Sequence, residues 1–352
     1  MKKTKVAVIG CGTIARSQHI PAYDKNPLAE IKYLVDIIPE RAKEMAEKYN
    51  VPNAIVDYRE MLNDEEVTAV SICTPNNAHA SIAIDCLNAG KNVLCEKPAA
   101  VSYELVKKMK EAADKNGKIL NIGVVNRFNT AVNKIKEMID NGELGNLYHI
   151  YSSFRAHRSI PGLGGQFTTK AKSGGGVLID WGVHFLDLIF YCISSPKVLT
   201  VTGGISGELG KNMEKYSYIN MWAGPPDYSG TYDVEDFVSG YIRTEGPAIS
   251  LNGAWAQNIA ESAMFIEFLG DKAGVKLQYG GDFKVYSANK GVLYETAPTF
   301  QKADMFYDEI DSFIKAAAEG TKTRANVDNV LTVSQVMDAI YDSAKLGKEI
   351  VL

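Results

Sequence analysis

Three polar side chains in this sequence are of types that together could oxidise an alcohol. Lys97 lies in Cys95-Glu96-Lys97-Pro98, and Asp180 and His184 stand four residues apart after three consecutive glycines. On a helix this spacing places Asp180 and His184 on one face, about one turn apart. Histidine has an unperturbed pKa of about 6.5, so it can accept a hydroxyl proton near neutral pH. We predict that Asp180 orients the His184 ring or holds the substrate, and that Lys97 stabilises a developing alkoxide.

The segment VAVIGCGTIA, residues 6–15, predicts what would receive the hydride. Its apolar, β-branched start is typical of a buried parallel strand that ends at Gly10. Gly10 allows a tight turn, Gly12 lets a pyrophosphate approach the backbone, and Ala15 lets the next helix pack closely. The amino end of that helix offers N–H groups and a partial positive charge to phosphates. The pattern predicts a dinucleotide site.

An acidic residue follows the second predicted strand and selects between dinucleotides. Asp36 stands roughly 20 residues beyond the glycines, where a carboxylate can accept hydrogen bonds from ribose hydroxyls. Its charge would repel a 2′-phosphate, and neither Ile37 nor Ile38 could neutralise one. Arg41 is the nearest cation. The sequence therefore predicts NAD(H) in preference to NADP(H).

The elements that must position these residues alternate in type over residues 1–125. Apolar strands are predicted at 6–9, 31–35, 54–56, 69–73, 92–95 and 119–124, and helices at 13–25, 39–49, 77–89 and 102–116. Such alternation is typical of an α/β, doubly wound parallel sheet, which binds ligands at the carboxyl ends of its strands. We predict a Rossmann domain over 1–125 whose cofactor-binding residues are Gly10, Gly12, Thr13, Ile14, Ala15, Asp36, Thr74, Pro75, Asn76, His79, Glu96 and Lys97.

The remaining residues, 126–352, have a different pattern. Strand-like segments at 147–154, 199–205, 237–243, 248–255, 264–269 and 275–279 alternate in polarity, which predicts a large open, mostly antiparallel sheet with helices on one face. We place Tyr241 and Trp255 on the other face, which is either an oligomer surface or a covered core face. The long segment 207–231 is a candidate lid or oligomer contact. We predict an α/β domain for substrate binding and oligomerisation.

Several other polar residues remain candidates with two interpretations each. A predicted strand is followed by Arg155, His157 and Arg158. These residues either line the substrate pocket or are charged residues at its rim. Asn126 and Arg127 stand at the predicted domain junction, where Arg127 either contacts substrate or tethers elements. His79 near a helix start is either a cap or a contact at the edge of the cofactor.

The composition bounds the class of protein. A chain of 352 residues with a net charge of −4 gives no electrostatic reason to bind nucleic acid or an anionic membrane, and its apolar runs fall short of a membrane span. Five cysteines without a C-x-x-C pair predict reduced thiols and a cytoplasmic protein. The five histidines show no metal-binding spacing, so no metal is expected.

The combination of GCGTIA, CEKP and GGGVLIDWGVHFLD resembles the Gfo/Idh/MocA oxidoreductases, the group of glucose-fructose oxidoreductase and inositol dehydrogenase, along the whole chain. The resemblance implies hydride transfer between NAD(H) and a secondary alcohol or ketone of a sugar, cyclitol or related polyol. It places the family's lysine, aspartate and histidine at Lys97, Asp180 and His184. It also suggests a cis peptide bond between Lys97 and Pro98.

Two other functions remain open at this point. An NAD-dependent glycosidase would oxidise a sugar hydroxyl transiently, eliminate the glycosidic substituent and return the hydride. A regulator would bind NAD without turnover, although the presence of Lys97, Asp180 and His184 weakens that alternative. For each, we expect a small-molecule partner and a homodimer or homotetramer formed through the C-terminal sheet.

Overall fold

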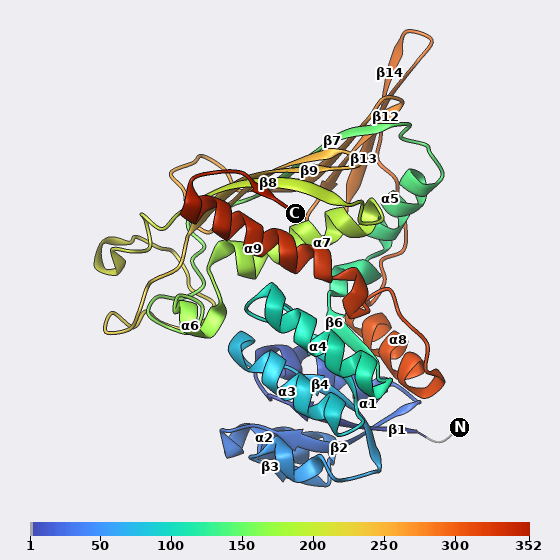
Figure 1. The fold of residues 1–352 in the computed structure, drawn as a ribbon, viewed down its shortest axis with the longest axis vertical. Coiled ribbons are helices and arrows are strands. Elements are labelled where there is room, and N and C mark those ends of the chain that lie inside the picture. Colours follow the sequence, from blue (N-terminus) through green and yellow to red (C-terminus); the bar gives the residue numbers. More distant parts are fainter. Residues whose placement is uncertain (1–2) are drawn as a thin grey trace. The chain divides into compact units, whose positions relative to one another are not determined.

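The apolar runs of the amino-terminal third form one parallel sheet in the computed structural model, which describes residues 3–352. Its strands follow the order β3-β2-β1-β4-β5-β6, so the direction of winding reverses between β1 and β4 (Figure 1). Ligands bind at such a reversal, beyond the carboxyl ends of the strands. The bounds are β1 (Thr4–Ile9), β2 (Ala29–Val35), β3 (Asn53–Ile55), β4 (Val67–Ile72), β5 (Asn92–Glu96) and β6 (Leu120–Gly123).

Helices connect these strands at the predicted places. A π turn at Ala15–His19 leads directly into α1 (Ile20–Lys25), followed along the chain by α2 (Pro39–Tyr49), α3 (Asn76–Asn88) and α4 (Tyr103–Asn116). α2 begins with Pro39, whose fixed φ suits the first helical position, and ends at Asn50 in a left-handed conformation. The predicted Rossmann architecture is confirmed.

The chain forms two compact units, one from residues up to Phe128 with Ala303–Leu331, the other from Asn129–Lys302 with Thr332–Leu352. The predicted division at residue 125 assigns the helix α8 (Met305–Glu319) to the second domain, whereas in the structure it belongs to the first unit. The reason is its apolar face, because Ile310, Phe313 and Ile314 are buried in the same cluster as β1 and α1 side chains. The first unit therefore contains a segment that is distant in sequence.

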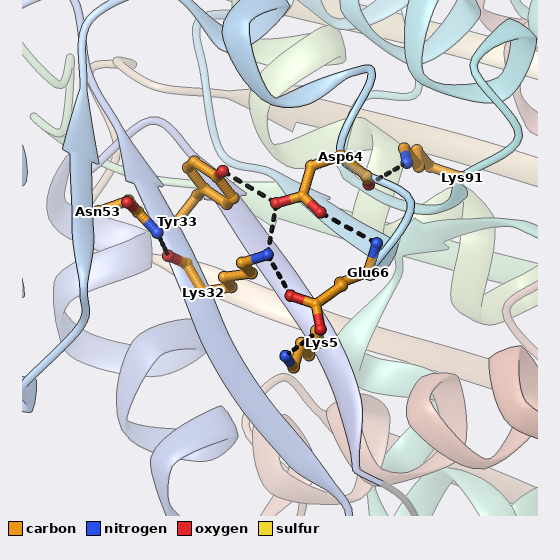
Figure 2. A network of polar contacts seen from close by, with 7 residues as sticks. All are labelled: Lys5, Lys32, Tyr33, Asn53, Asp64, Glu66 and Lys91. Carbon is orange, nitrogen blue, oxygen red and sulfur yellow. Dashed lines mark hydrogen bonds and ion pairs between the residues drawn. The ribbon is translucent and has the colours of Figure 1, made fainter.

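A network of charged side chains joins strands of the first unit near their amino ends (Figure 2). Lys32 on β2 contacts both Asp64 and Glu66 at 2.5 Å, and Lys5 on β1 contacts Glu66 at 2.8 Å. The hydrogen bonds from Lys32 hold the pKa of Asp64 at about 2, and those from Lys32 and Lys5 hold that of Glu66 at about 2. This network lies at the end of the sheet away from Gly10, so it holds the strands without occupying the ligand edge.

The second unit contains a mostly antiparallel sheet in the order β14-β13-β12-β11-β7-β10-β9-β8-β15, in which β7 and β10 are the parallel pair. This confirms the predicted open sheet, although β13 and β14 were not among the predicted strands. The bounds are β7 (Leu147–Arg155), β8 (Val198–Ser206), β9 (Phe237–Thr244), β10 (Ala248–Ala254), β11 (Ala263–Gly270), β12 (Ala273–Gln278), β13 (Phe283–Asn289), β14 (Val292–Thr296) and β15 (Ile350–Val351).

Helices cover one face of this sheet, as Figure 1 shows for α7 (Val183–Cys192) and α9 (Leu331–Leu346). Side chains from α5 (Thr130–Asp140), α7, α9 and the inner face of the sheet form a single apolar core. Tyr241 lies on the other face and is 37% exposed, as predicted. The prediction for Trp255 is wrong: it follows the end of β10 and is fully buried, because its ring fills the core.

Residues 170–192 are the one part of the described chain whose helix is long and apolar enough to cross a membrane. Of its most apolar window, 78% is buried inside the protein, as expected for a core helix. All five cysteines are buried thiols that form no disulfide. Among residues 3–352, no group of three or more His, Cys, Asp or Glu side chains could hold a metal ion.

Candidate functional site

The glycine turn lies at the carboxyl end of β1 and leaves room that larger residues would fill. Gly10 has a φ of +91°, and a methyl group there would lie 2.6 Å from the carbonyl oxygen of Cys73. At Gly12 a methyl group would meet no atom within 4 Å. Gly10 is therefore required by the approach of two strands, whereas Gly12 borders open space. Exposed Thr13 and half-buried Ile14 begin the helix that follows, and Ala15 is buried against the sheet.

Asp36 is fixed at the carboxyl end of β2 by two backbone groups. Cys11 N–H donates to its Oδ2 and Ile38 N–H to its Oδ1, each at 2.8 Å. A carboxylate has about four acceptor sites, so this arrangement uses two and leaves others available. The bond to Cys11 also ties Asp36 to the glycine turn. Asp36, which we predict binds the ribose, is thus hydrogen-bonded to the turn that we predict binds the pyrophosphate.

The loop after β4 carries Thr74, Pro75 and Asn76, which stands at the start of α3. The Thr74 hydroxyl oxygen is buried and has no hydrogen-bond partner among residues 3–352. His79 is fully buried, and its two ring nitrogens lie 2.8 Å from the carbonyl oxygens of Thr74 and Pro98. Burial lowers the pKa of His79. Each ring nitrogen therefore has a backbone carbonyl as its neighbour, so His79 lies between two loops of the site.

Glu96 and Lys97 end β5 and begin the next loop. The Lys97–Pro98 peptide bond is cis, as predicted. The Glu96 carboxylate is buried between His19 and the backbone N–H of Lys97, at 2.8 and 3.2 Å. His19 was not a predicted site residue. Its spacing of four residues from Ala15, on the inner face of the same helix, is the sequence signal that could have indicated it.

These residues fit a bound dinucleotide on three observations. Gly12 borders open space, Asp36 presents unused acceptor sites, and the Thr74 hydroxyl is buried without a partner. An unsatisfied buried hydroxyl costs free energy unless a ligand supplies its hydrogen bond. The first unit therefore has the features of a site completed by a polar ligand.

In the second unit, Asp180 and His184 lie on consecutive turns of one helical segment. Asp180 is in a π turn, Leu178–Gly182, and His184 is in the first turn of α7. The buried indole N–H of Trp255 donates to the Asp180 carboxylate at 3.3 Å. The His184 ring lies 6.3 Å from that of Tyr279, centroid to centroid. π turns interrupt α-helices most often at functional sites, and this chain has one in each predicted site segment.

A buried carboxylate that sequence reasoning missed holds the start of this helix. Glu235 accepts hydrogen bonds from the N–H groups of Gly176 and Leu178, at 2.9 and 3.0 Å, and from the Tyr341 hydroxyl at 2.8 Å. Burial raises the pKa of Glu235 despite these donors. A negative group at a helix amino end satisfies free N–H groups and favours the helix dipole. Glu235 therefore supports the segment that carries Asp180.

The three glycines before Asp180 are required by the structure of this segment. A methyl group on Gly176 would lie 1.9 Å from the Glu235 carbonyl oxygen, and one on Gly175 would lie 2.0 Å from the Tyr341 hydroxyl. Gly174 has a φ of +88°. Gly175 and Gly176 are therefore required by packing, and Gly174 by its backbone conformation.

This assignment predicts the effect of a single methyl group. Gly176→Ala should lower the free energy of unfolding by about 1–3 kcal/mol, because overpacking against rigid backbone costs that much. Gly165→Ala is the matched control, since a methyl group there meets nothing within 4 Å. Urea denaturation of both variants measures the difference. Equal midpoints for Gly176→Ala and Gly165→Ala would show that the glycine has no packing role.

Asn126 and Arg127, in the 3-10 turn Val125–Phe128, lie within the first unit. Arg127 is 1% exposed, and its guanidinium donates to the carbonyl oxygens of Arg324 and Asn329 at 2.6 and 2.8 Å. We therefore assign Arg127 the tethering role and not substrate contact. Asn126 is also buried.

Arg155 ends β7, and His157 and Arg158 follow it. Arg155 lies with Ser153 on the exposed face of the sheet, opposite Phe154, whose ring packs on Phe185 of α7. His157 Nδ1 and Arg158 lie at hydrogen-bond distance from the carbonyl oxygen of Gln257, at 3.0 and 2.8 Å. These contacts indicate that His157 and Arg158 stabilise the loop that contains Gln257.

A doubly wound unit with a glycine turn and a fixed acidic residue, joined to an open-sheet unit carrying an aspartate and a histidine, defines a dinucleotide-dependent oxidoreductase. Family models agree: residues 4–124 match the oxidoreductase family with the NAD-binding Rossmann fold, and residues 132–276 match the GFO/IDH/MocA C-terminal domain. The chain belongs to the Gfo/Idh/MocA family of oxidoreductases.

Two curated relatives and one solved structure illustrate this membership. The D-glucoside 3-dehydrogenase of Escherichia coli is 30% identical over 99% of this chain and 97% of its own length. The myo-inositol 2-dehydrogenase of Thermotoga maritima is 29% identical over 59% of this chain and 61% of its own. A levoglucosan dehydrogenase in complex with NADH shares the fold, with a TM-score of 0.86 and 23% identity over 99% of each chain.

Proposed function

We propose that this protein oxidises a secondary hydroxyl group of a sugar, cyclitol or related polyol, or reduces the corresponding ketone. The observation that carries the proposal is the pair of Asp180 and His184 on one helical segment, with Asp180 oriented by Trp255 and the segment capped by Glu235. NAD, when bound by Gly12, Asp36 and Thr74, supplies the hydride acceptor.

His184 is the proposed base. As the alcohol carbon loses hydride, the hydroxyl proton must leave the oxygen, and the imidazole accepts it. The Asp180 carboxylate favours the imidazolium that forms and limits the orientations of the substrate. The products are the ketone, the reduced cofactor and a proton that His184 passes to water. Proton transfer of this kind contributes about 10²–10⁴-fold to the rate.

Lys97 is proposed to act on the same oxygen from the first unit. Its position directly after β5 belongs to the carboxyl edge where open parallel sheets bind ligands. An ammonium group there stabilises negative charge on the oxygen while the proton moves.

The similarity over 99% of the chain to a D-glucoside 3-dehydrogenase supports glucosides as the substrate class. The inositol dehydrogenase matches over a smaller share of the chain, 59%, so cyclitols are the second class to examine.

The test is absorbance at 340 nm with NAD and a panel of D-glucosides, free hexoses and inositols. We expect NADH to form in proportion to oxidised sugar. Release of the glycosidic substituent without net NADH would identify the glycosidase instead. NAD binding by fluorescence with no product from any sugar would favour the regulator. NADP is tested in parallel as the alternative cofactor.

We propose further that a second copy of the chain covers the exposed face of the second unit's sheet. This face carries Tyr151 and Tyr241, and it contains a depression of about 550 Å³. Apolar and aromatic side chains on an open sheet are typical of oligomer surfaces. The lining residues are Tyr151, Ser152, Ser153, Arg155, Ser250, Leu251, Asn252, Phe265 and Glu267.

Light scattering tests this interface. The protein should have the mass of a dimer or tetramer, and Tyr151→Glu should lower that mass because an uncompensated charge would be buried. Val56→Glu, at an exposed position of the first unit, is the control and should leave the mass unchanged. A monomeric wild-type protein at micromolar concentration would contradict the proposal.

We also propose a cytoplasmic location, which the five free cysteines support because oxidising compartments favour disulfides. Fractionation of the source cells, followed by immunoblotting, tests it.

A further inference from the structure

A chain of buried polar groups crosses the first unit and ends at the residue before Lys97. The Tyr23 hydroxyl lies 2.7 Å from Ser71 Oγ, Ser71 Oγ lies 3.2 Å from His19 Nδ1, and His19 Nε2 lies 2.8 Å from Glu96 Oε1. His19 and Ser71 are fully buried, and Tyr23 and Glu96 are nearly so. Such a network is stable only when each donor finds an acceptor.

Every donor of this network finds an acceptor when the hydrogens point from Tyr23 toward Glu96. The Tyr23 hydroxyl donates to Ser71, the Ser71 hydroxyl donates to His19 Nδ1, and His19 Nε2–H donates to Glu96. Burial raises the pKa of Tyr23, so its hydroxyl keeps its proton. In this arrangement every hydrogen is used, and the Nε2–H of His19 is directed at Glu96.

Glu96 connects the buried network to the backbone of Lys97. Its Oε2 accepts the backbone N–H of Lys97 at 3.2 Å. Burial raises the pKa of Glu96, but the hydrogen bond from His19 and the charges of His19 and Lys97 outweigh it and hold that pKa below its usual value. Gly123 leaves room for the Glu96 carboxylate, since a methyl group at Gly123 would lie 3.1 Å from its atoms. Glu96 is therefore a charged, oriented carboxylate.

The residue after Lys97 is held as well. His79 bridges the carbonyl oxygens of Pro98 and Thr74, at 2.8 Å from each. Lys97 thus stands between two residues that are each fixed by a fully buried histidine, one in the helix after the glycine turn and one in α3.

We propose that His19, acting through Glu96, is a positioning residue for Lys97. This inference deepens the proposed function, because it assumes that Lys97 acts on the substrate oxygen. His19 keeps the Glu96 carboxylate charged and aimed at the Lys97 backbone, and that carboxylate also supplies a negative charge close to the lysine. The Glu96 carboxylate, held by His19, thereby fixes the backbone from which the Lys97 side chain extends to the hydroxyl group.

Two matched polar variants test it. In His19→Gln the amide nitrogen extends to the place of Nε2 and still donates to Glu96. In His19→Asn the shorter side chain keeps a partner for Ser71 and does not reach Glu96. Both are amides at the same buried position, and the melting temperature of each measures how far the fold is disturbed.

We expect His19→Asn to lower kcat by 10- to 100-fold, because small displacements of a catalytic group cost about that much. The KM for the sugar and the Kd for NADH should change less than threefold. His19→Gln should restore kcat to within about threefold of the wild type. Equal losses in the two variants, or no loss in His19→Asn, would overturn the proposal.

A readout independent of turnover separates this inference from the proposed function. Acetylation of Lys97 by acetic anhydride, followed by peptide mass spectrometry, should be at least threefold faster in His19→Asn than in the wild type or His19→Gln. Exposed Lys172 is the internal control and should react equally in all three. Unchanged labelling of Lys97 would overturn the positioning role. Faster labelling in a protein that oxidises no sugar would support that role and contradict the proposed function.

Discussion

His184→Ala should lower kcat by about 10²–10⁴-fold while the Kd for NADH changes little. The rate falls because the hydroxyl proton loses its base, an effect of this size in general base catalysis. Cofactor affinity is retained because the predicted NAD residues, Gly12, Asp36 and Thr74, belong to the first unit, whereas His184 belongs to the second. Steady-state kinetics at 340 nm and quenching of NADH fluorescence measure the two quantities.

His184→Gln is the matched control for this prediction. It keeps a polar side chain of similar size but cannot accept a proton, so its kcat should fall nearly as far. A parallel loss of NADH binding in His184→Ala would mean that the residue supports the fold or the cofactor, and it would remove the assigned role as base.

Asp36→Ala should weaken NAD binding by about 10- to 100-fold, because hydrogen bonds to charged groups contribute roughly 1.5–3 kcal/mol each. NADP binding should weaken far less, since the same change removes a negative charge that opposes the 2′-phosphate. The ratio of the two dissociation constants, measured by fluorescence titration, should therefore shift toward NADP.

Asp36 also holds the N–H groups of Cys11 and Ile38, so its loss could loosen the turn. Asp36→Asn controls for this effect, because the amide keeps an acceptor for one of them while losing the charge. If the NAD/NADP ratio is the same in wild type and both variants, Asp36 does not select the cofactor.

Local patterns were sufficient to predict the parallel sheet and its connecting helices in the amino-terminal part of the first unit. The run Val6–Ile9 with Gly10 and Gly12 predicts strand, turn and helix together, and the helix predicted at 39–49 spans Pro39–Tyr49 in the structure. Each of these features depends on residues close in sequence, since burial on both faces makes parallel strands continuously apolar. The cis bond before Pro98 came from the family resemblance and is confirmed.

Contacts between distant residues could not be predicted in this way. Glu235 lies about 60 residues from the helix it caps, at separations of 59 and 57 in sequence, and no local motif marks the pair. Trp255 was placed on the outer face although it has the same parity along the chain as Ile249 and Leu251, which are buried in the core. β14 escaped prediction because all its residues are exposed, which leaves no apolar alternation.

The central claim is that Lys97, Asp180 and His184, from two units, act on one hydroxyl group of a sugar. A crystal structure of the enzyme with NAD and a D-glucoside tests it most directly. The account predicts that Lys97 and His184 both hydrogen-bond the hydroxyl on the carbon that faces the nicotinamide ring, with Asp180 beside them. A complex in which any of these three side chains points away from the bound sugar would contradict it.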